Sequence, residues 1–145
     1  MSLKSTIQVL NRLLAIHTRS LPMYLSYAQP AWHRGDEVAR DTLQSVVDDQ
    51  RVMAERLGEL ISEIGVAYEG AFPTVFTGYH DLSFDFLLGK IIEYQQRDIT
   101  AIEQCVGDLV MVPMAKALAE EALGAAKAHL EAWQELKHGP LAVAH

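Results

Sequence analysis

Residues 114–137, MAKALAEEALGAAKAHLEAWQELK, decide the fold, because their apolar residues recur at steps of three and four. On a helix of about 3.6 residues per turn, these positions form one narrow face. That face comprises Leu118, Ala122, Ala125, His129, Trp133 and Leu136, and the same spacing adds Met111 from just before the segment. The segment therefore predicts an amphipathic helix that carries one imidazole into an apolar core.

Three earlier segments show the same periodicity, and each has one polar residue near the middle of its apolar face. The four expected helices cover about residues 3–28, 36–64, 82–106 and 114–137. Pro22 lies inside the first pattern and predicts a kink near residues 18–21. We predict an all-α four-helix bundle, with residues 1–137 as a single domain and residues 138–145 as a C-terminal tail.

The connection between the second and third helices is long. Residues 65–81 are rich in glycine, proline, threonine and aromatic residues and show no sustained period. The second helix, at about 28 residues, is roughly 42 Å long. About 16 extended residues reach roughly 53 Å. The connection is therefore long enough to run the length of the bundle, so that the second and third helices run parallel.

Composition and charge exclude several classes of function. A chain of 145 residues with a formal net charge of −7 has no basic stripe for nucleic acid or an anionic membrane surface. The single cysteine, Cys105, rules out an intramolecular disulfide framework and indicates a small buried residue. No segment approaches 18 uncharged apolar residues. We expect a soluble, cytoplasmic protein.

The polar interruptions are His17, Gln50, Gln95 and His129. Helices of similar length, packed side by side, place these residues at about the same depth. A buried polar group without a partner costs about 1–3 kcal/mol, so the four should bond to one another, to water or to a metal. The alternatives are a hydrogen-bonded layer that fixes helix register, a metal site, or helix phases that drift and turn some of them outward.

A metal site here would contain one iron, manganese or zinc ion. Its candidate ligands are His17, His129 and a carboxylate from Asp49 or Glu93. Asp49 flanks the buried face of the second helix, and Glu93 lies off the apolar stripe of an ideal third helix.

Two long helices, an extended crossover and two more long helices resemble the ferritin-like superfamily, including its rubrerythrin-like and bacterioferritin-like members. The resemblance covers about residues 3–137 and implies a bundle with a central di-iron site. In that family, two helices each supply a glutamate and the other two each supply Glu-x-x-His.

Most of those ligand positions hold other residues here. His129 matches a family histidine, but Ala126 stands where its glutamate partner would be. In the second helix, Asp49 is followed by Val52 and Gln50 by Met53, so that histidine is missing. In the other two helices, His17 or Ser20 stands at the first glutamate position, Glu93 has the sequence separation of the second, and Tyr24 and Tyr27 resemble tyrosines that line such bundles.

These departures predict a bundle without a complete di-iron site, and a non-catalytic binding or interaction protein. The alternative is a protein or oxidoreductase with one metal in the central His/carboxylate cluster. A bundle of the DinB-like metal-binding type, which uses three histidines, is a further resemblance. We also expect a homodimer, for which Phe72, Phe76 and Tyr79 are candidate contacts unless they cap the bundle or lie in its groove.

Overall fold

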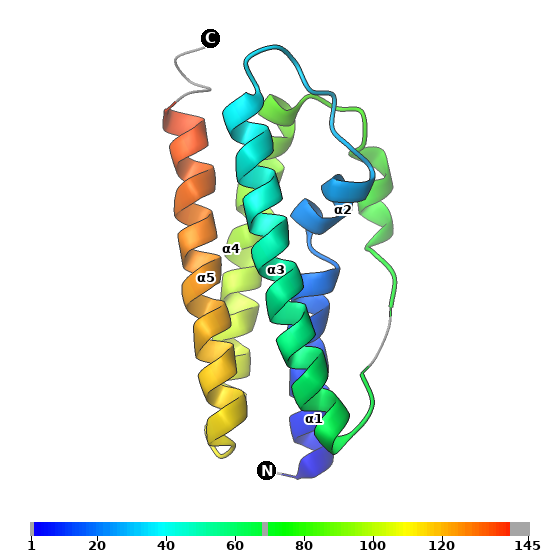
Figure 1. Cartoon of the computed structure of the whole chain (residues 1–145), viewed down its shortest axis with the longest axis vertical. Coiled ribbons are helices and arrows are strands. Elements are labelled where there is room, and N and C mark those ends of the chain that lie inside the picture. Colours follow the sequence, from blue (N-terminus) through cyan, green and yellow to red (C-terminus); the bar gives the residue numbers. More distant parts are fainter. Residues whose placement is uncertain (1, 68–69, 140–145) are drawn as a thin grey trace.

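The computed structural model describes residues 2–67 and 70–139, which form a bundle of helices (Figure 1). The elements are, in chain order, α1 (Leu3–Thr18), α2 (Leu21–Tyr27), α3 (Glu37–Ile64), the 3-10 helix η1 (Thr74–Gly78), α4 (Phe84–Asp108) and α5 (Pro113–His138). Outside these helices, the described residues add one isolated bridge, between Ala31 and Ser83. The prediction of an all-α fold is confirmed.

The first predicted helix is broken where the proline indicated a kink. α1 ends at Thr18, and Ser20 then caps α2 by accepting a hydrogen bond from the backbone N–H of Met23. Pro22 lies in the first turn of α2, where its missing N–H costs no helical hydrogen bond. The break therefore forms two helices with a polar side chain, Ser20, at the junction.

α3 and α4 begin at the same end of the bundle and run in the same direction (Figure 1). The loops that precede them are hydrogen-bonded to each other: the Ala31 N–H donates to the Leu82 carbonyl, and the Asp81 N–H donates to the Gln29 carbonyl. Between α3 and α4, the described residues 70–83 return along the side of the bundle, as the length of the connection predicted. η1 interrupts this return with a short helical turn that the sequence pattern did not reveal.

Aromatic side chains hold the crossover against the bundle. Phe76 of η1 is 2% exposed, and its ring packs at 5.7 Å from Tyr24 of α2 and 5.3 Å from Tyr94 of α4. Phe72 packs edge-on against Tyr24, with ring centroids 5.4 Å apart. Of the two alternatives for the loop aromatics, these contacts favour the groove of the bundle: Phe76 is buried there, and Phe72 and Tyr79 are half-buried.

The helix boundaries differ from prediction by one or two residues. α4 begins two residues later than expected, because Ser83 caps it by accepting the N–H of Phe86, and it ends two residues later than expected, at Asp108. The prediction that Met111 lies on the buried face of the fourth helix is wrong, because Met111 precedes α5 and is 73% exposed. α5 runs one residue past the predicted boundary of the domain, to His138, and residues 140–145 of the predicted tail lie outside the described part of the chain.

Two hydrophobic clusters build the core, one toward each end of the bundle. One contains Leu10, Leu13 and Leu14 of α1, and the other begins in α2 with Leu21. α3, α4 and α5 contribute to both clusters, so each of these three helices passes from one to the other. Between the two clusters, each of them carries one buried polar residue, Gln50, Gln95 or His129, and His17 lies near the end of α1, before the chain continues into α2.

Within the described residues, no helix combines the length and apolar character needed to cross a membrane.

The crossover packing predicts a large effect at Phe76. Phe76→Ala should lower the free energy of unfolding by about 3–5 kcal/mol, because it removes a buried ring from between α2 and α4. Val75→Ala, at the neighbouring 52% exposed position, is the control and should change it by no more than about 0.5 kcal/mol. Equal effects in urea denaturation would show that the crossover is not anchored through Phe76.

Candidate functional site

The four predicted core polar residues are all buried. Their exposed fractions are 5% for His17, 6% for Gln50, 3% for Gln95 and 8% for His129. Drift of the helix phase does not turn any of them outward. They form a polar layer, made of these four side chains, between the two hydrophobic clusters.

The two glutamines use one end of each amide to bond to a neighbouring helix. The Ser20 hydroxyl donates to Gln50 Oε1 at 2.7 Å, which joins the start of α2 to α3. Gln95 Nε2 donates to the backbone carbonyl of Ala126 at 3.0 Å, which joins α4 to α5. These bonds fix the register of the helices, as expected for a structural layer. Each amide retains a second polar atom that makes no hydrogen bond within the described residues.

His17 bonds to its own helix. Its Nδ1 lies 2.8 Å from the Leu13 carbonyl oxygen, and since a carbonyl only accepts, Nδ1 carries the proton. Burial lowers the pKa of His17, the bond to Leu13 opposes this shift, and the nearby charge of His129 lowers the pKa further. The neutral ring therefore carries a lone pair on Nε2.

His129 pairs with a carboxylate across the helices. Its Nε2 lies 2.8 Å from Asp49 Oδ2, which joins α5 to α3. Asp49 thus turns toward the layer although its side chain remains 60% exposed, whereas neighbouring Asp48 is exposed and accepts from Gln44. In neutral His129, the Asp49 bond fixes the proton on Nε2 and leaves the lone pair on Nδ1.

Glu93, the other predicted carboxylate ligand, faces away from the layer. Its side chain is 46% exposed and pairs with Arg97 at 2.7 Å and Lys90 at 3.8 Å along the surface of α4. Glu93 does not line the central cavity. The helical phase of Glu93 indicated that it faces away from the core, and its observed position agrees with that phase. Its sequence separation from His129, which suggested a ligand, was misleading.

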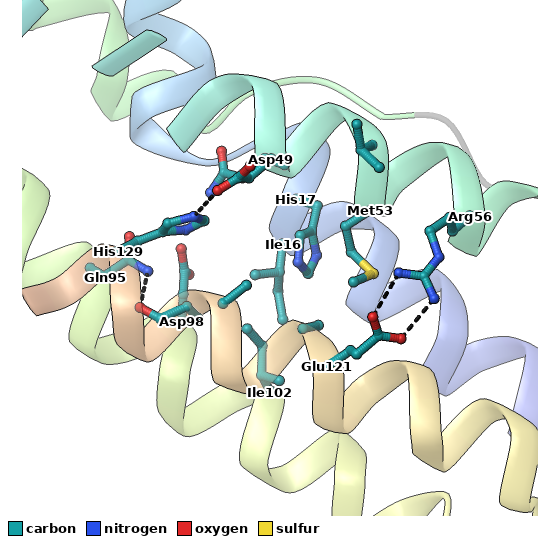
Figure 2. A pocket seen from close by; sticks show the side chains of 15 residues that line it. Ile16, His17, Asp49, Met53, Arg56, Gln95, Asp98, Ile102, Glu121 and His129 are labelled. Atoms are coloured by element: carbon teal, nitrogen blue, oxygen red, sulfur yellow. Dashed lines mark hydrogen bonds and ion pairs between the residues drawn. The ribbon is translucent and has the colours of Figure 1, made fainter. Parts of the chain in front are cut away.

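A cavity of about 320 Å³ adjoins the polar layer, and all four long helices line it (Figure 2). Apolar side chains such as Ile16, Met53 and Ile102 form part of its wall. Arg56 of α3 and Glu121 of α5 also line it, joined by two hydrogen bonds of 3.0 and 2.7 Å. Both of these side chains are about half exposed, so their pair lies where the cavity meets solvent.

Asp98 is the carboxylate of this cavity that sequence reasoning missed. It is half-buried on α4, and Figure 2 shows it pointing toward the space between His17 and His129. It makes no hydrogen bond or ion pair with the described residues, and burial raises its pKa to about 7. A second groove, which includes Arg12 and Tyr94, also borders it.

The sequence did contain a signal for Asp98. It lies three residues after Gln95 and four before Ile102, so helical spacing places it beside the recognised apolar stripe. Ser20 and Arg56 were harder to identify, because their roles depend on partners in other helices. Cys105 conforms to expectation: it is fully buried, and burial raises the pKa of its thiol.

The donor set does not fit the di-iron centre that the family resemblance implies. Ala126, Val52 and Met53 occupy motif positions and offer no ligand side chains. Within residues 2–67 and 70–139, no three His, Cys, Asp or Glu side chains are grouped closely enough to hold one metal ion. His17, His129 and Asp49 therefore do not form a preassembled ligand set.

The fold and site define a class: an all-α bundle whose buried polar layer faces a central cavity. Comparisons with protein-family models, curated proteins and solved structures find no match for this chain. Its function has to follow from the chemistry of the site.

Asp98 predicts a specific dependence of stability on pH. Because its pKa is about 7 in the folded chain and 3.8 in the reference state, the folded chain holds a proton that the unfolded chain releases between these values. Its contribution to the free energy of unfolding is lost as pH rises through about 7. Asp98→Asn should remove this loss, so the variant gains stability relative to the wild type between about pH 4 and pH 7, with little further change above that.

Paired chemical denaturation curves for the two proteins measure this difference. His17 has the opposite effect, since its lowered pKa means that stability is lost as pH falls. Both proteins contain His17, so its effect cancels in the difference between the two curves. A difference that does not change with pH would contradict the assignment to Asp98.

Proposed function

We propose that this chain is a non-catalytic member of the ferritin-like type of bundle that binds a small molecule in its central cavity. The observation that carries the proposal is the cavity of about 320 Å³ beside buried polar groups with unused bonding capacity. Small-molecule sites combine an apolar wall with a few convergent polar groups, and this cavity has both.

The polar layer has more bonding capacity than helix register requires. Gln50, Gln95 and His17 each make one hydrogen bond, which satisfies one polar atom of the side chain and fixes its orientation. Yet Gln95 Oε1 and His17 Nε2 make no bond within the described residues. An apolar residue would fill these positions if packing alone were required. The unused atoms support a role in binding.

The parallel course of α3 and α4 supports the ferritin-like part of the proposal, since it needs the long crossover seen in such bundles (Figure 1). Loss of the glutamate positions supports the non-catalytic part. Peroxide turnover by the purified protein with bound iron would contradict it.

A single bound metal is the second candidate, favoured by the orientation of the two imidazoles. His17 donates from Nδ1 to a carbonyl and His129 approaches a carboxylate with Nε2, the pattern by which outer oxygen atoms orient metal-binding histidines. Binding would need a carboxylate to move, because three ligands are not grouped among the described residues. About one equivalent of metal that is lost in His129→Ala would establish this candidate.

Dimerisation stays a prediction without an assigned surface, since Phe76 is buried against the bundle. Light scattering over a range of concentrations tests it, and a monomer at every concentration would contradict it.

Filling the cavity tests the main proposal. Ala125 lines the cavity from α5, and Ala125→Leu should abolish binding of small molecules that stabilise the wild type in a thermal-shift screen. Ala128→Leu, on the exposed side of the same helix, is the matched control and should retain binding. Compounds that bind both variants equally would place their site elsewhere, and a screen without any binder would contradict a small-molecule function.

A further inference from the structure

The hydrogen bonds already made in the central cavity decide which atoms remain for a ligand. Gln95 uses its amide nitrogen on the Ala126 carbonyl, so its oxygen is left as an acceptor. His17 uses Nδ1 as a donor to Leu13, so Nε2 is left as an acceptor. In neutral His129, the Asp49 bond likewise leaves Nδ1.

These unused atoms are accessible. Among the described residues, the one side-chain nitrogen or oxygen that is both fully enclosed and without a partner is Trp133 Nε1, in the hydrophobic cluster. Gln95 and His17 are themselves 3% and 5% exposed, so their remaining polar atoms meet solvent through the cavity they line. Their side chains point inward from α4 and α1 (Figure 2).

Donors are scarce in the same cavity. Gln50, whose oxygen accepts from Ser20, keeps an amide nitrogen as donor. Arg56 bonds to both oxygens of Glu121 through its two terminal nitrogens. Asp98 adds a carboxylate with no partner in the described chain. Arg56 is thus already paired, and the groups left for a ligand are mainly acceptors.

We propose that the central cavity binds a protonated primary amine, whose ammonium group donates to Asp98, His17 and Gln95. An ammonium group has three donors in a compact arrangement, which matches three acceptors from two helices. Ile16, Met53 and Ile102 pack against the carbon stem of the amine. This inference rests on the proposed small-molecule function and adds the chemical class of the ligand.

The spacing of the groups favours an ammonium ion over a divalent metal. Metal ligands must converge to about 2.0–2.2 Å from one ion, and no such group of three exists among the described residues. Hydrogen bonds to an ammonium span about 2.7–3.2 Å and also form through water. An ammonium ion therefore does not require the close grouping of ligands that a metal ion requires.

Calorimetric titration of the full chain with benzylamine, and in parallel with benzyl alcohol, tests the proposal at about pH 7.5, where the amine is protonated. The two probes share their shape and differ in the ammonium group. Benzylamine should bind at least about tenfold more tightly, as expected for hydrogen bonds to a charged group. Asp98→Asn should remove this preference, and Ala125→Leu should block both probes.

Asp48→Asn is the control, because it removes the same charge from an exposed position of α3 that does not line the cavity. It should change benzylamine affinity by less than about twofold. Thermal unfolding of each variant verifies that it is folded before titration.

Each other outcome overturns the inference in a distinguishable way. Equal binding of both probes, blocked by Ala125→Leu, would remove the amine preference and leave the small-molecule cavity standing. Binding of zinc but not benzylamine, lost in His129→Ala, would replace it with the metal candidate. Failure of benzylamine, benzyl alcohol and a wider screen to bind would overturn both the inference and the proposed function.

Discussion

The structure depends on the hydrogen bonds that satisfy polar groups inside an apolar bundle. The bond from His17 Nδ1 to Leu13 is the clearest case, because it both permits burial of the ring and fixes which nitrogen keeps a lone pair. The bonds at Gln95 and His129 each join two helices, and each also fixes the orientation of a polar atom that has no partner. Stability and binding chemistry thus come from the same contacts.

The periodic pattern predicted the helices and their buried polar residues well. A run of apolar residues at helical spacing reports burial directly, so His17, Gln50, Gln95 and His129 were identified from their phase alone. The crossover followed from length, since 16 or so residues without a period can run along a helix of that size. The structure adds the aromatic contacts of Phe76, which depend on residues distant in sequence.

The partners within the site could not be predicted in the same way. Helix phase places Asp49 at the edge of a buried face, and only the position of His129 on another helix decides that it turns inward. Glu93 was chosen from its separation in the sequence, yet nearby Arg97 and Lys90 hold it at the surface. Asp98 was missed because a carboxylate beside an apolar stripe is ordinarily solvated. The periodicity of a single helix therefore predicts which side chains are buried, whereas contacts between helices decide which polar groups bond to one another.

The most direct test is the nitrogen NMR spectrum of the two core imidazoles at about pH 7.5, since proton-bearing and lone-pair ring nitrogens resonate at well-separated positions. The bonds in the polar layer predict a neutral His17 with its proton on Nδ1, and a proton on Nε2 of His129. A proton on Nε2 of His17, or a charged His17 ring, would contradict a cavity wall built from acceptors.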